Sequence, residues 1–76
     1  MNKNLALKFG EVIRMFRKDQ NLSQEELAFK AGVHRTYIGM IERGEKNITL
    51  ENIQKLSRAL NISMKTIFEI LENRIK

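Results

Sequence analysis

Residues 22–47, LSQEELAFKAGVHRTYIGMIERGEKN, contain the pattern that decides the fold. The SQEE in this stretch predicts the start of a helix, because the Ser23 hydroxyl can accept from the Glu26 amide while the Glu26 carboxylate reaches back to the Ser23 amide. The helix should stop near Ala31, since Gly32 can adopt the left-handed conformation that ends a helix. The stretch therefore opens with one short, well-delimited helix.

A second short helix should follow over residues 35–43 and end at Gly44, although His34 is a poor capping residue at its start. Two short helices joined by a tight turn at residues 32–34 describe a helix-turn-helix unit. The spacing supports this unit, because it places a small residue at the helix contact, a glycine in the turn and apolar residues in the wedge between the helices: Leu27, Ala28, Gly32, Val33, Ile38 and Ile41.

Outside this unit the sequence predicts three more helices. The first spans about residues 5–20, the fourth is capped by Thr49 and runs to Leu60, and the last is capped by Ser63 and covers residues 63–76. In the fourth helix one face carries Leu50, Ile53, Leu56 and Leu60. The expected architecture is all-α, a compact five-helix bundle formed by one domain over residues 1–76.

Composition limits the classes of function. The chain has 76 residues, no Cys, one His and a net charge of +5 from 14 basic and 9 acidic residues. Without Cys there are no disulfides, and a lone His leaves zinc without a ligand set. No apolar run suits a membrane span or a signal peptide, so we expect a cytoplasmic protein. The positive charge suits a polyanionic partner.

Enzymatic activity finds no support in the sequence. There is no nucleophile and base pair and no glycine-rich phosphate loop. We also expect no cofactor and no small-molecule ligand, because no ligand domain is present. The protein is therefore expected to act by binding a macromolecule.

The chain resembles the phage-repressor-like helix-turn-helix family (Cro/CI, or XRE). The resemblance rests on residues 22–47, on the IERG at residues 41–44 and on LENIQKLSRALNIS at residues 50–63. It is most similar to the controller proteins of restriction–modification systems, which are small dimeric members of that family. Solitary phage or chromosomal repressors share much of the pattern and stay open, as does an antitoxin or adaptor that uses the same fold to bind protein.

The resemblance implies that the second helix of the unit enters the major groove of double-stranded DNA. Helical phasing points Thr36, Met40 and Arg43 outward, and Arg35 projects from the first turn. The residues expected at base edges are Arg35, Thr36, Tyr37 and Met40, and those expected at phosphates are Ser23, Gln24, Tyr37, Arg43, Lys46 and Asn47. The alternative for each is an ordinary surface side chain.

Two further features lie off this face. Glu42 phases inward, and a buried carboxylate needs a partner. The resemblance implies Arg17, with Arg14 as the alternative, so we expect a structural ion pair. Phe29 points away from the predicted core, and partial packing on a neighbouring helix is expected there.

The last helix has a wider apolar arc than a core requires. The arc spans about 160°, whereas a core-facing stripe needs about 100°. The family dimerises through this region, so we expect a homodimer whose interface includes Ile67, Phe68, Ile70 and Leu71. The alternative is that this helix only closes the bundle. For controller proteins the resemblance also implies recruitment of RNA polymerase.

Overall fold

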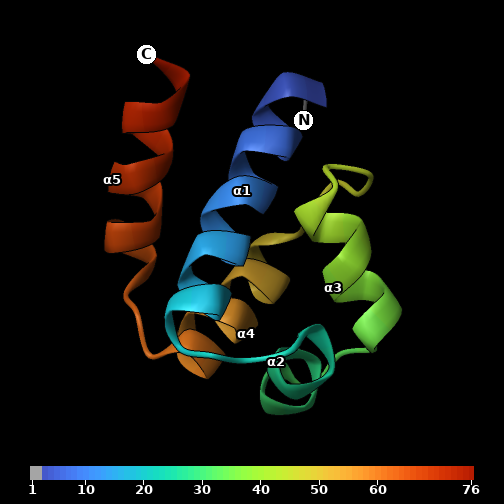
Figure 1. Ribbon diagram of the computed structural model, residues 1–76. Helices are drawn as coiled ribbons and strands as arrows, with labels where there is room; N and C mark the ends of the chain where they lie inside the picture. The colour runs from blue at the N-terminus through green and yellow to red at the C-terminus, as the bar shows by residue number, and fades with distance from the viewer. Residues whose placement is uncertain (1–2) are drawn as a thin grey trace.

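The computed structural model describes residues 3–76 and forms five helices over them (Figure 1). These are α1 (Lys3–Asp19), α2 (Gln24–Ala31), α3 (Arg35–Glu42), α4 (Leu50–Leu60) and α5 (Met64–Ile75). The predicted all-α, five-helix architecture with a helix-turn-helix is confirmed, and α2 and α3 form the unit. None of these helices is long and apolar enough to cross a membrane.

The starts of four helices are fixed by local capping. Ser23 and Glu26 form both bonds of the capping box, at 2.8 and 3.0 Å. Thr49 and Ser63 cap α4 and α5 with their hydroxyl groups. His34 also caps α3, because its Nδ1 accepts from the Thr36 amide at 3.1 Å. A histidine ring nitrogen therefore takes the place of the usual hydroxyl.

The ends of α1 to α4 share one device. Each helix is followed by a residue with positive φ, and the amides of that residue and the next one bond back to carbonyls of the last turn, as in the Schellman motif. After α3, for example, the Gly44 amide donates to the Ile41 carbonyl at 3.0 Å and the Glu45 amide to the Met40 carbonyl at 2.9 Å. The positive-φ residues are Asn21, Gly32, Gly44 and Asn61.

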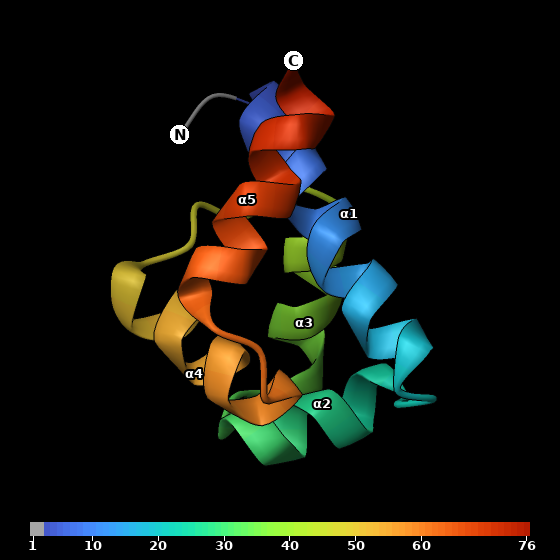
Figure 2. The same ribbon diagram turned by 90° about the vertical axis from the view of Figure 1, so that its left-hand side faces the viewer.

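The helices pack around one core in which α1 lies between α3 and α5 (Figure 1). The C-terminal half of α5 runs beside α1 (Figure 2), and Arg74 near the end of α5 donates to Glu11 in the middle of α1 at 3.1 Å. α2 packs on α3 and α4. Fully buried large side chains come from all five helices: Val12, Ile13, Leu27, Ile38, Leu56, Leu60 and Ile67.

Two predictions about apolar faces are wrong in part. Leu50 is 78% exposed rather than part of the α4 core face, because at the first position of α4 it lies outside the packed stripe of that helix. Ile67 and Leu71 are buried within the protomer, so they close the core instead of offering surface to a second copy. On α5, Phe68 remains exposed and Ile70 half-buried.

Candidate nucleic-acid interface

α2 and α3 form a single rigid unit. The Val33 amide donates to the Ala28 carbonyl at 3.0 Å, which turns the chain directly after α2. Leu27 and Ala28 on α2 and Ile38 on α3 are buried in the common core. Only residues 32–34 connect α2 to α3. Because this connection is short, the packing of these side chains fixes the orientation of α3.

The N-terminal turn of α3 projects into solvent. Arg35 and Thr36 are both exposed, as expected for residues that reach a duplex edge. The Arg35 guanidinium lies 3.4 Å from the Glu25 carboxylate on α2, and both side chains are largely exposed. A surface pair of this kind is weak. Arg35 therefore stays available for another anion or acceptor.

Tyr37 and Met40 are half-buried. The Tyr37 hydroxyl accepts a hydrogen bond from Asn52 Nδ2 on α4 at 2.8 Å, which still leaves its own O–H as a donor. Met40 is less exposed than the outward prediction for it implies. Sequence reasoning also missed Asn52, and no spacing signal distinguishes it on α4.

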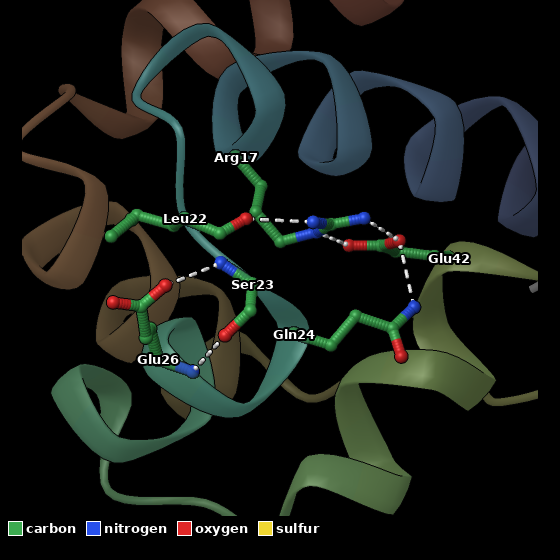
Figure 3. A network of polar contacts seen from close by, with 6 residues as sticks. All are labelled: Arg17, Leu22, Ser23, Gln24, Glu26 and Glu42. Carbon is green, nitrogen blue, oxygen red and sulfur yellow. Dashed lines mark hydrogen bonds and ion pairs between the residues drawn. The ribbon is translucent and has the colours of Figure 1, made fainter.

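A buried ion pair lies behind this face and joins α1 to α3 (Figure 3). Arg17 Nε and Nη2 donate to the two carboxylate oxygens of Glu42 at 2.6 and 3.0 Å, and Arg17 Nη1 donates to the Leu22 carbonyl at 2.7 Å. Hydrogen bonding to Glu42 raises the pKa of Arg17 above its ordinary value. Arg14, the alternative partner, is exposed.

Three of the residues expected at phosphates, Ser23, Gln24 and Arg43, already have partners within the protein. The Ser23 hydroxyl accepts from the Glu26 amide as the helix cap. Gln24 Nε2 donates to Glu42 Oε1 at 3.1 Å (Figure 3). Arg43 binds Glu45 through two hydrogen bonds, Nε to Oε2 at 3.0 Å and Nη2 to Oε1 at 3.1 Å. Lys46 and Asn47 are exposed just beyond it.

Two open clefts meet at Arg43. One, of about 590 Å³, lies between the start of α2 and the outer side of α3, with Gln24, Arg35 and Thr36 in its lining. The other, of about 550 Å³, lies beyond the end of α3 and includes Lys3 and Lys46. Cationic side chains line both clefts, which therefore suit an anionic partner that runs along α3.

Phe29 lies outside both clefts and is 88% exposed on α2, so the expectation of partial packing is wrong.

Over residues 3–76 there is no group of His, Cys, Asp and Glu that could hold a metal ion. The face built by α2 and α3 therefore offers hydrogen-bond donors, cations and a projecting helix end.

Known proteins share this arrangement. A helix-turn-helix family model matches residues 13–67. Control protein C.BamHI of Bacillus amyloliquefaciens is 46% identical over 70 residues, which cover 91% of this chain and 86% of that protein. The named relatives are control proteins and transcriptional regulators, which agrees with the prediction that this protein is not an enzyme.

Solved structures agree in fold. The restriction-modification controller protein C.AhdI from Aeromonas hydrophila matches with a TM-score of 0.81 at 46% identity, covering 83% of this chain and 96% of that one. The wild-type controller protein C.Esp1396I matches with a TM-score of 0.88 at 35% identity, covering 93% of each chain. The chain therefore belongs to the helix-turn-helix family, as a DNA-binding regulator similar to the controller proteins of restriction–modification systems.

Proposed function

We propose that this protein is the controller of a restriction–modification system, acting in the cytoplasm as a homodimer on a pseudo-palindromic operator. The observation that carries the proposal is the exposed N-terminal turn of α3, with Arg35 and Thr36 projecting from a rigid helix pair. In a helix-turn-helix this turn meets base edges in the major groove. Similarity to C.BamHI and C.AhdI supports the controller role.

Arg35 is the proposed reader of a guanine. Its guanidinium fork matches the O6 and N7 acceptors of that base, and such a contact is worth about 1–3 kcal/mol of discrimination. The long, exposed contact to Glu25 is easily exchanged for a base edge. Thr36 offers a hydroxyl and a methyl beside it, and Tyr37 and Met40 offer the half-buried edge of the same helix.

Phosphate contacts are assigned to the two ends of the unit. Ser23 and Gln24 stand at the N-terminus of α2, where the helix dipole favours an anion. Arg43, Lys46 and Asn47 follow α3, and the Tyr37 hydroxyl keeps its proton for donation. These contacts would fix the register of the protein on the duplex without reading sequence.

A second copy of the chain is proposed to cover the outer side of α5. Exposed apolar side chains recur along one side of this helix at Met64, Phe68 and Ile75, which are 37%, 38% and 43% exposed. The half-buried Ile70 packs against the core on the opposite side of the buried Ile67 and Leu71. A domain of this size gains from an added apolar contact. A symmetric dimer would present two copies of α3 to half-sites about one DNA turn apart.

The regulatory role follows from the controller similarity. The targets would be the promoter of the protein's own gene and that of an endonuclease gene, with RNA polymerase recruited by one bound dimer. The concentration of the protein would determine the activity of these promoters.

The proposal is tested by selecting duplexes from a random pool with the purified protein. A pseudo-palindrome should be enriched, and the enrichment should collapse in Arg35→Ala. Arg58→Ala, which removes an exposed arginine of α4 outside the unit, should select the same palindrome as the unmodified protein. Uniform, salt-sensitive binding to every duplex would contradict sequence reading. An endonuclease gene beside the coding sequence would support the controller role.

A further inference from the structure

The turn after α3 holds a carboxylate against Arg43. Gly44 has φ +72° in this turn, and a Cβ there would lie 2.7 Å from the Leu7 Cα of α1. The Glu45 amide is fixed at the same time by its bond to the Met40 carbonyl. The backbone conformation at Gly44 and the packing of the turn against α1 are both constrained. The backbone therefore places Glu45 next to Arg43.

Glu45 occupies the edge of Arg43 that a phosphate would use. Two parallel N–H donors of a guanidinium match two oxygens of a carboxylate or of a phosphate equally well. Arg43 commits Nε and Nη2 to Glu45, while its Nη1 lies over Gly39 on the side of Gln24. The hydrogen bonds from Arg43 also lower the pKa of Glu45, so the competing carboxylate is ionised at neutral pH.

The surroundings of Glu45 are otherwise cationic. The cleft beyond α3 is lined by Lys3, Arg43 and Lys46 together with Asn47, and Glu45 is the one acidic side chain among its lining residues. An anion therefore already sits among three cations. A DNA phosphate that binds the Nε and Nη2 donors of Arg43 must displace that carboxylate.

We propose that Glu45 is an intramolecular competitor of DNA phosphate for Arg43, and that it limits the affinity of the protein for duplexes of any sequence. The proposal rests on the proposed function and adds to it a residue that opposes binding. Non-specific affinity comes from phosphate contacts. Weakening one such contact lowers the fraction of protein held on DNA outside the operator, while the base contacts of α3 are untouched.

The test compares Glu45→Gln with Glu51→Gln in binding to a random-sequence duplex at low salt. Both substitutions remove one exposed negative charge, but of the two only Glu45 belongs to an ion pair among residues 3–76. Glu45→Gln should raise affinity about three- to fivefold, the upper part of the range set by an exposed ion pair, and Glu51→Gln by less than twofold. Equal gains in affinity for the two variants would mean that the effect comes only from the change in net charge, and would overturn the proposal.

The same comparison in an Arg43→Ala background identifies the partner. There Glu45→Gln should add no more affinity than Glu51→Gln, because the contested guanidinium is gone. A gain that persists would mean that Glu45 repels DNA directly, and a loss of affinity in Glu45→Gln alone would mean that it orients Arg43 for binding. Either result overturns the proposal. Thermal unfolding of each variant checks folding.

These experiments distinguish failure of DNA binding from failure of the competitor role of Glu45. If the unmodified protein binds no duplex, the proposed function falls and the role of Glu45 falls with it. If the unmodified protein selects its palindrome while Glu45→Gln behaves like Glu51→Gln, only the competitor role is lost.

Discussion

Gln24 on α2 and Arg17 on α1 donate to the same oxygen of Glu42 on α3, over 3.1 and 3.0 Å. One buried carboxylate therefore joins three helices. Gln24 also stands at the edge where a phosphate contact is proposed, so its side chain is positioned by a group in the interior. The proposed DNA face and the core are connected at this point.

Glu42→Ala should destabilise the fold severely. The substitution leaves the Arg17 guanidinium buried without its carboxylate, and breaking a buried pair costs about 3–5 kcal/mol. Urea unfolding at neutral pH measures the change. Glu25→Ala, which breaks the exposed pair with Arg35, should cost less than about 1 kcal/mol. Equal costs for the two substitutions would contradict a buried structural role for Glu42.

Acid should weaken the start of α2. Hydrogen bonds from the Ser23 amide and hydroxyl hold the pKa of Glu26 below its ordinary value. A carboxyl whose pKa is lower in the folded state contributes stability above the unfolded-state pKa, and this is lost as pH falls through the folded-state pKa. Glu26→Gln should therefore unfold with a shallower pH dependence in the acid range, measured by urea midpoints at several pH values. An unchanged dependence would contradict the prediction.

Alanine should have opposite effects at two helical glycines. At Gly39 a Cβ would meet only the tips of flexible side chains, Arg43 Nη1 at 3.0 Å and Gln24 Oε1 at 3.5 Å. Gly39→Ala should then stabilise the fold by up to about 1 kcal/mol through helix propensity. At Gly10 a Cβ would overlap the Ile41 carbonyl oxygen, so Gly10→Ala should destabilise by about 3 kcal/mol or more. Thermal unfolding of both variants gives the comparison.

Phe68→Glu should convert the proposed dimer to a monomer. Phe68 is partly exposed on α5, and a charge in an apolar interface would be desolvated without a partner. Sedimentation at micromolar concentration should give twice the 8.9 kDa chain mass for the unmodified protein and a single chain for the variant. Lys55→Glu on α4 should remain dimeric. An unmodified protein that sediments at the mass of one chain would contradict the dimer.

The helix ends were largely predictable from the sequence, because caps and stops are local. Ser23, Gly32 and Thr49 act through bonds to residues within a few positions of themselves. Asn21 was missed as the stop of α1, although its positive φ is common for asparagine at such a site. Local chemistry therefore fixed the order and bounds of the elements.

The outer faces were less predictable, because coverage depends on neighbouring helices. The apolar arc of α5 does not reveal which of its residues pack against the other helices. In the structure Ile67 is buried within the protomer and Phe68 remains exposed. The hydrogen bond between Tyr37 and Asn52 likewise joins two helices that phasing treats separately. The carboxylate opposite Arg43 depends on the conformation of Gly44 as well as on sequence spacing.

The junction at residues 32–34 has a thermodynamic consequence for association with a duplex. Its backbone is already immobilised by the bonds from Val33 to Ala28 and from Thr36 to His34. Little conformational entropy remains to be lost there on binding, so the helix pair is preorganised. The large heat-capacity change that accompanies coupled folding should be absent from this part of the molecule.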